Sequence, residues 1–107
     1  GATVTFTPPV SSCVLAICRG FASDTSNVPG PRLGYLRIRK NGVVYDDVQA
    51  STAYSYADPN GGWIQIWGDL TVAFQDTGSG SAISYVASNY LESPFTAFQW
   101  SVFILKK

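Results

Sequence analysis

The residue types that support catalysis are scarce in this sequence of 107 residues, and they do not cluster. Its seven acidic side chains include one adjacent pair, Asp46-Asp47. Catalysis by two carboxylates requires both on one side of a cleft, whereas neighbours on a strand point to opposite faces. We interpret the pair as a solvated strand end. Since the chain contains no histidine, Ser-His-Asp and Cys-His chemistry are excluded, and we predict a non-enzymatic protein.

Two glycine-containing turns carry residue types that occur in ligand sites. Asp58-Pro59-Asn60-Gly61 has oxygen ligands spaced as in a calcium loop, but it lacks the later acidic positions and the bidentate glutamate. An Asx turn explains this segment better. Gly78-Ser79-Gly80 has the glycine content of a phosphate loop without a lysine or a following helix. We therefore predict no metal site and no cofactor, and we expect a mobile loop at residues 77–81.

The two cysteines, Cys13 and Cys18, flank the apolar run Val14–Ile17. In an extended strand they lie about 16 Å apart and point to opposite faces, whereas a disulfide needs Cα atoms within about 7 Å. Their spacing matches no common zinc or redox motif. We predict two free thiols that act as small apolar side chains.

The segment Trp63–Trp67 contains the aromatic pattern that indicates binding. We expect its two isoleucines to share a face with Leu36 of the core, which puts Trp63, Gln65 and Trp67 on the opposite face. Two exposed tryptophans around a glutamine are typical of a sugar platform, because aromatic rings stack on pyranoses and amides bind hydroxyls. The same face also fits a subunit contact, in which tryptophan is enriched, or the second layer of the core, and we favour these two interpretations.

The elements that position these residues are predicted to be β-strands. Valine, isoleucine, threonine and aromatic residues are abundant, methionine is absent, and short runs alternate with Gly, Pro, Asn, Asp and Ser clusters. We predict strands at 3–7, 13–21, 33–40, 43–48, 51–57, 62–68, 70–75, 82–87 and 96–105. We expect an all-β fold, a single antiparallel β-sandwich domain over residues 1–107 that is jelly-roll-like.

Two connections have clear sequence signals. Asn41-Gly42 predicts a type I′ hairpin, because both central positions of that turn need a positive φ. The segment Ser23–Pro31 is polar, carries two prolines and has no periodicity, which predicts the longest loop.

Alternation predicts which faces of two strands are buried. Leu36 and Ile38 point one way, while Arg37 and Arg39 point the other and form a cationic outer face. We expect these arginines to pair with the acidic pair at 46–47 or with a neighbouring subunit; a patch for an anionic glycan is the alternative. The last strand has large apolar groups on both faces from Phe98 to Leu105, and we predict that both faces are covered. Identical neighbours are the simplest cover, which predicts a homotrimer.

Charge and hydropathy exclude two kinds of partner. Seven basic side chains balance seven acidic ones, and charged residues make up 13% of the chain, so we predict no nucleic-acid contact. No apolar run approaches the about 20 residues that cross a bilayer, so we predict no membrane insertion.

The order of several short patterns resembles the terminal domains of tailed-phage fibre and host-specificity proteins. These patterns are Val4–Pro9, Val14–Ile17, Leu36–Gly42, Tyr56–Pro59 and Ser101–Lys107. Those domains are trimeric β-sandwiches or jelly rolls, similar in outline to the globular heads of complement and tumour necrosis factor ligands. The resemblance implies a location in the virion and a non-enzymatic role, in which three copies present loops to a host surface molecule.

We therefore predict a virion surface module, at a phage tail fibre or tail tip, that binds a host surface glycan or protein and other virion proteins. A carbohydrate-binding module or lectin and a capsid decoration (head-fibre) domain are the alternatives. Loops held by a rigid sandwich carry recognition in such folds. The predicted binding residues are Asp24, Ser26, Asn27, Asp58, Asn60, Trp63 and Trp67.

Overall fold

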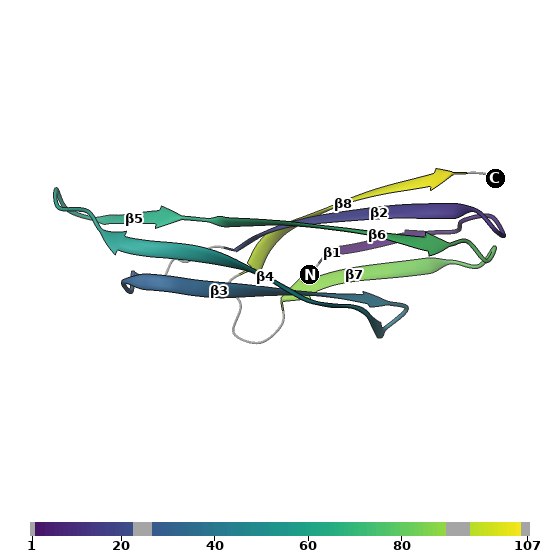
Figure 1. Ribbon diagram of the computed structural model, residues 1–107, viewed down its shortest axis with the longest axis horizontal. Helices are drawn as coiled ribbons and strands as arrows, with labels where there is room; N and C mark the ends of the chain where they lie inside the picture. The colour runs from purple at the N-terminus through teal and green to yellow at the C-terminus, as the bar shows by residue number, and fades with distance from the viewer. Residues whose placement is uncertain (1, 23–26, 90–94, 106–107) are drawn as a thin grey trace.

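The computed structural model describes the backbone of residues 2–22, 27–89 and 95–105, and the side chains of these residues except 46–50 and 95–98. Every regular element of this part is a β-strand (Figure 1). The strands are β1 (Ala2–Phe6), β2 (Cys13–Ala22), β3 (Gly30–Lys40), β4 (Val43–Ala57), β5 (Trp63–Ile66), β6 (Gly68–Thr77), β7 (Ile83–Asn89) and β8 (Phe95–Leu105).

The strands form two antiparallel sheets. A five-stranded sheet has the order β1-β7-β3-β4-β5, and a three-stranded sheet has the order β6-β2-β8. All pairings of neighbouring strands are antiparallel. The all-β, sandwich-like antiparallel fold is therefore confirmed, and the jelly-roll connectivity stays a prediction.

Strand boundaries differ from the predicted ones at several places; β3, for example, begins at Gly30, inside the predicted loop Ser23–Pro31. The sequence predicts separate strands at 43–48 and 51–57, but β4 runs unbroken over both. Its register with β3 shifts on either side of Ile38, so an irregularity in the ladder replaces the predicted break. β5 and β6 are separated by Trp67, where the chain leaves one sheet and joins the other while continuing in nearly the same direction (Figure 1).

The turn between β3 and β4 is the predicted hairpin. Asn41 and Gly42 have φ of 49° and 85°, the positive values that a type I′ turn needs. The N–H of Asn41 donates to the carbonyl of Ser84 at 2.8 Å, and its Oδ1 accepts from the N–H of Ser84 at 2.9 Å. The hairpin is therefore bound to the neighbouring strand β7.

The loop at residues 77–81 is hydrogen-bonded to the loop between β1 and β2, and its mobility stays a prediction. Gly78 accepts from the N–H of Ser11 at 2.8 Å and donates to the carbonyl of Ser12 at 2.9 Å, and Gly80 donates to Pro8 at 3.0 Å. A Cβ on Gly78 would lie 2.1 Å from the carbonyl oxygen of Pro9, so the glycine allows the two loops to meet.

The core lies where the two sheets face each other. Val14 and Cys18 of β2 are fully buried, and Leu36 and Ile38 of β3 are 1% exposed, which confirms the predicted buried face of β3. Cys13 lies on the opposite face of β2, so the predicted placement of the two free thiols is also confirmed. Burial raises the pKa of the Cys18 thiol to about 11.

A partly buried ion pair links the two sheets. Lys40 Nζ of β3 lies 2.6 Å from Asp76 Oδ2 of β6, and the Tyr85 hydroxyl of β7 donates to the same oxygen at 2.5 Å. Burial opposes ionisation of Asp76, but the hydrogen bonds from Lys40 and Tyr85 outweigh it and lower the pKa of Asp76. The Tyr85 ring stacks on Trp100 of β8 with ring centroids 5.7 Å apart. The pair and the stacked rings together fix one sheet against the other.

The molecule is elongated because one sheet extends beyond the other. Its extents are 58 × 22 × 16 Å, and its radius of gyration is 16.8 Å, whereas a compact domain of this length has about 13 Å. The three-stranded sheet ends at Ala22, which pairs with Gly68 and Phe95. β3, β4 and β5 continue past this point, toward the left of Figure 1. We call this extension the arm (residues 30–33 and 52–67) and the two-layered remainder the body.

Candidate functional site

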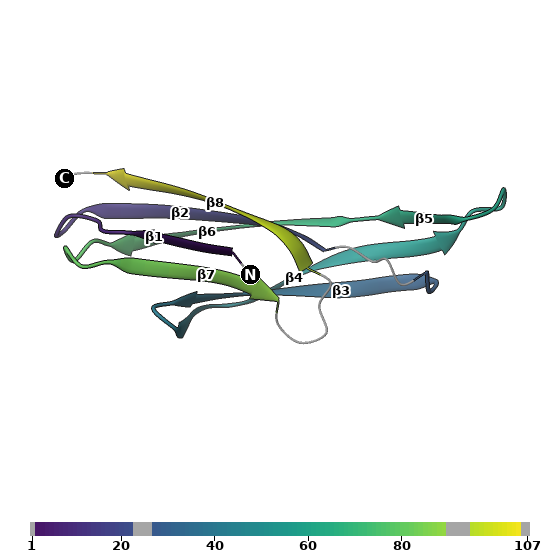
Figure 2. The same cartoon turned by 180° about the vertical axis from the view of Figure 1, so that it is seen from behind.

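The predicted binding residues divide into two groups. Asp24 and Ser26 lie outside the described residues. The other five lie on the arm or against it: Asn27, Asp58, Asn60, Trp63 and Trp67. Seen from behind in Figure 2, the arm projects from the body at the right of the view. The fold thus brings these five residues to one end of the molecule.

The turn between β4 and β5 forms the tip of the arm. Asp58 Oδ1 accepts a hydrogen bond from the N–H of Asn60 at 2.9 Å, which is the predicted Asx turn. The N–H of Gly61 donates to the Asp58 carbonyl at 2.9 Å, and the Asp58 N–H donates to the Gly62 carbonyl at 3.0 Å. Asp58 is therefore used to shape the turn. Among the described residues, no group of cysteine and carboxylate side chains is arranged to hold a metal ion.

The pairing of β5 with β4 decides which side chains share a face of the arm. The pairs are Tyr54 with Ile66, Ser55 with Gln65, Tyr56 with Ile64, and Ala57 with Trp63. Directly paired residues point to the same face of a sheet. Ser55 is buried, and Ala53, two residues earlier, belongs to the same core cluster as Leu36. Trp63 and Gln65 therefore lie on the inner face, which continues the core face of the sheet.

The predicted faces of β5 are consequently wrong. The isoleucines, and not the tryptophan, point away from the core face that carries Leu36. Alternation within five residues shows which side chains share a face. Only the register against β4 shows which of the two faces is the inner one.

The inner face of the arm carries an exposed indole beside two amides. Gln65 Nε2 donates to Asn27 Oδ1 at 3.3 Å, so the segment before β3 reaches β5. Trp63 lies two residues from Gln65 on the same face and is 38% exposed. An aromatic ring next to hydrogen-bonding amides is chemistry that binds sugars. We call Asn27, Trp63 and Gln65 the arm-tip site.

Trp67 lies at the base of the arm. It is the residue between β5 and β6, and it is 54% exposed. Because the strand pattern is interrupted there, alternation no longer assigns Trp67 to the face of Trp63. The sugar platform made of both tryptophans stays a prediction.

The outer face of the arm is apolar and uncovered within the chain. Four of its side chains are about half exposed: Leu33, Tyr54, Tyr56 and Ile66. We call these four residues the arm face. Sequence reasoning missed this surface, although the alternation of tyrosines with small residues in Thr52–Ala57 is the signal that reveals it.

A second exposed apolar surface lies on the outer face of the three-stranded sheet. Phe103 and Leu105 of β8 are 52% and 57% exposed, and Phe103 pairs with Leu15 of β2, which shares its face with Ile17. We call these four residues the β8 stripe. The other face of β8 packs against the core through Trp100. Within the single chain the outer face of β8 is exposed, and the predicted cover of both faces, one of them by identical neighbours, stays a prediction.

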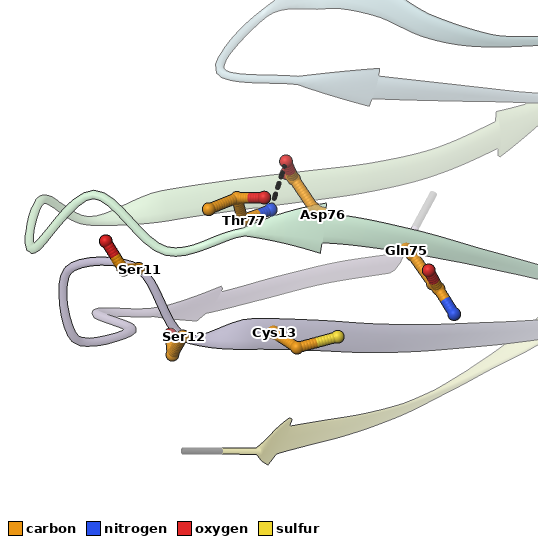
Figure 3. Close-up of a pocket in the computed structure, with 6 residues that line it drawn as sticks. All are labelled: Ser11, Ser12, Cys13, Gln75, Asp76 and Thr77. Carbon is orange, nitrogen blue, oxygen red and sulfur yellow. Dashed lines mark hydrogen bonds between the residues drawn. The ribbon is translucent and has the colours of Figure 1, made fainter. Parts of the chain in front are cut away.

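A shallow depression of about 190 Å³ lies at the end of the body opposite the arm (Figure 3). Its lining residues are Ser11, Ser12, Cys13, Gln75, Asp76 and Thr77. Asp76 Oδ1 accepts from the N–H of Thr77 at 2.8 Å, and its Oδ2 is bound by Lys40 and Tyr85. Because both carboxylate oxygens are engaged, Asp76 is no base for the thiol of Cys13 or the nearby hydroxyls.

Two arginines have defined partners. Arg19 Nη2 lies 2.7 Å from Asp69 Oδ2, and this hydrogen bond lowers the pKa of Asp69. On the outer face of the five-stranded sheet, Arg39 Nη1 donates to Ser88 Oγ at 3.4 Å. The acidic side chains at 46–47 lie outside the described ones, so pairing with the arginines at 37 and 39 stays a prediction.

Comparison with known proteins gives no relative for this chain. No family model matches it, and neither the curated proteins nor the solved structures contain a match. In the part of the chain that the structure describes, no helix is long and apolar enough to cross a membrane. The functional argument therefore rests on the geometry of the arm and the body.

Proposed function

We propose that this chain is a non-enzymatic, homotrimeric recognition module of a virion, at a phage tail fibre or tail tip, and that its arm binds a glycan of the host surface. The observation that carries the proposal is the arm itself. It projects from the sandwich and brings together Asn27, Trp63 and Gln65. Binding residues held at a protruding end by a rigid scaffold meet an outside molecule first.

The chemistry of the arm-tip site supports a sugar ligand. The Trp63 indole offers an apolar ring for the apolar face of a pyranose. The amides of Gln65 and Asn27 already hydrogen-bond to each other, which orients them and leaves further donor and acceptor positions for hydroxyl groups. An amide pair fixed before binding loses little conformational entropy when a ligand arrives.

Removal of the indole tests this proposal. Trp63→Ala is expected to weaken binding to an array of bacterial surface polysaccharides by about 30-fold, equivalent to about 2 kcal/mol, and Asn27→Ala by about 10-fold. Trp67→Ala is the matched tryptophan variant; it weakens binding only if the platform extends to the base of the arm. Val10→Ala, at an exposed position of the opposite end, is the control.

Two results would contradict the proposal. One is normal polysaccharide binding by both Trp63→Ala and Asn27→Ala, with unchanged melting temperatures. The other is loss of binding on replacement of Arg37 or Arg39, which would place recognition on the outer sheet face.

The capsid decoration domain remains a second candidate because of the exposed arm face and β8 stripe. Large exposed apolar surfaces mark protein contacts. A decoration domain binds capsid protein and no polysaccharide, so the array separates the two functions. A lectin shares the arm-tip chemistry but is monomeric or dimeric, so molar mass by light scattering separates it from the fibre module.

A further inference from the structure

The inner face of the arm carries one charged side chain among the residues that the structure describes. This side chain is Arg32 of β3, which is exposed and pairs with Ala53 of β4. Because Ala53 belongs to the core cluster, Arg32 shares the inner face with Trp63 and Gln65. The other described side chains that the strand pairing puts on this face are uncharged: Ala53, Ser55, Ala57, Trp63 and Gln65. A ligand that binds to this face therefore meets a positive charge.

The strand register gives the position of Arg32 relative to the arm-tip site. Gln65 pairs with Ser55, and Ser55 pairs with Gly30, two residues before Arg32. Arg32 thus lies about 10 Å across the sheet and about 7 Å along it from Gln65. Trp63 lies two residues from Gln65 in the opposite direction along the arm. Along the arm, Gln65 is therefore between the indole ring and the guanidinium group.

The carboxylate of Asp58 lies beyond the other end of this row of residues. Asp58 follows Ala57, which pairs with Trp63, and its Oδ1 accepts the hydrogen bond that shapes the tip turn. Its negative charge is therefore on the side of Trp63 and away from Arg32. Arg32 interacts within the chain, and its five N–H donors allow it to bind a ligand as well.

We propose that the glycan is acidic and that Arg32 binds its carboxylate or phosphate group. This inference rests on the proposed function and names the ligand class of the arm-tip site. A planar guanidinium binds two oxygen atoms of such a group at once. Since Arg32 and Trp63 are about 13 Å apart along the arm, the anionic group belongs to a different sugar unit from the one that stacks on Trp63. The ligand is then at least a disaccharide.

Removal of the charge from the ligand, together with replacement of Arg32, tests this inference. The probes are bacterial surface polysaccharides that contain uronic acids or phosphate groups. Each is used in its native form and in a neutral form, in which the carboxyl groups are reduced to hydroxymethyl groups or the phosphate groups are removed. Wild-type protein is expected to bind one of the two native classes about 10-fold more tightly than its neutral form. The class that shows this preference identifies the anionic group.

The variants assign the preference to Arg32. Arg32→Gln is expected to abolish it, because glutamine keeps polar groups and loses the charge. Arg32→Lys keeps the charge without the planar fork and is expected to retain a preference of about 3-fold. Arg39→Gln is the matched control, since Arg39 belongs to the same strand and donates to Ser88 on the outer face of the sheet. It is expected to keep the wild-type preference.

Three results would overturn the inference. They are equal binding of the native and neutral forms by wild-type protein, a preference that Arg32→Gln retains, and an equal loss of preference in Arg39→Gln. In the first case the proposed function still stands if Trp63→Ala weakens binding to both forms. If wild-type protein binds neither form, the proposed function is refuted together with this inference. Circular dichroism verifies that each variant is folded, and Arg32→Ala replaces Arg32→Gln if that variant is not.

Discussion

The body and the arm use similar residues in different ways. β4 passes through both, and in the arm the neighbouring residues Ala53 and Tyr54 are 0% and 46% exposed. In the body the outer face of the same sheet carries polar side chains such as Thr3, Thr5 and Ser84, next to the apolar Val44 and Val86. In the arm that face is apolar. A polar outer face needs no cover, whereas an apolar one does. Exposed apolar side chains thus occur on the outer face of the arm and, in the body, on the outer face of β8 at Phe103 and Leu105.

The largest expected effect is a difference in the free energy of unfolding between variants of two leucines of β3. Leu36 is 1% exposed in the body, and Leu33 is 50% exposed in the arm. Leu36→Ala is expected to lower the free energy of unfolding by about 3 kcal/mol, because it leaves a cavity. Leu33→Ala is expected to cost less than about 1 kcal/mol. Urea unfolding of both variants measures this, and equal losses of unfolding free energy would show that Leu33 is as well covered as Leu36.

The two thiols give the next contrast. Burial raises the pKa of Cys18 from 9.0 to about 11, so its thiolate fraction near neutral pH falls about 100-fold. We expect iodoacetamide to modify Cys13 at least about 100 times faster than Cys18 in the folded protein. Unfolded, unreduced protein should take up two labels. A mass two hydrogens lower and no label would mean a disulfide.

The partly buried pair of Lys40 and Asp76 makes the stability of the body depend on pH. The pKa of Asp76 is below its ordinary 3.8 in the folded protein, so the unfolded chain takes up the proton first as the pH falls. The stabilisation is complete above pH 3.8 and is lost as the pH falls through the folded pKa.

Asp76→Asn should therefore lower the free energy of unfolding at neutral pH and flatten the acid limb of the stability curve. Urea midpoints between pH 2 and 7 measure this. Asp69→Asn, which removes an exposed pair with Arg19, is the matched control and should change little. Equal losses of unfolding free energy for the two variants would contradict a special role of the Lys40–Asp76 pair.

The smallest effect compares two turn glycines. Gly42 in the body and Gly61 at the arm tip have φ of 85° and 102°, with no atom within 4 Å of an added Cβ. Substitution by alanine therefore costs backbone strain alone, about 1 kcal/mol. We expect Gly42→Ala to lower the free energy of unfolding by this full amount. Gly61→Ala is expected to lower it less in the single chain, because a single-layered arm opens locally. Hydrogen exchange of β5 amides measures that opening, and equal costs with slow exchange would show that the arm folds with the body.

Local signals in the sequence determined the features that depend on a few neighbouring residues. Asn41-Gly42 specifies its turn because both residues tolerate positive φ, and Asp58 specifies an Asx turn because its oxygen reaches the N–H of Asn60. Alternation in β3 identified Leu36 and Ile38 as buried, since the side-chain period of a strand is fixed by geometry. The all-β composition and the opposite orientation of the two thiols of β2 also depend only on neighbouring residues.

Only the tertiary structure decided the features that depend on pairing between distant segments. The face of Trp63 follows from the register of β5 on β4, and a shift of one residue would exchange it with Ile64. The loop at 77–81 is fixed by backbone bonds to residues 8–12, which its glycine content does not reveal. The arm exists because one sheet ends at Ala22 and the other continues. The lengths of the strands in the two sheets are set by contacts between residues far apart in sequence. No local pattern therefore encodes the difference in length between the two sheets.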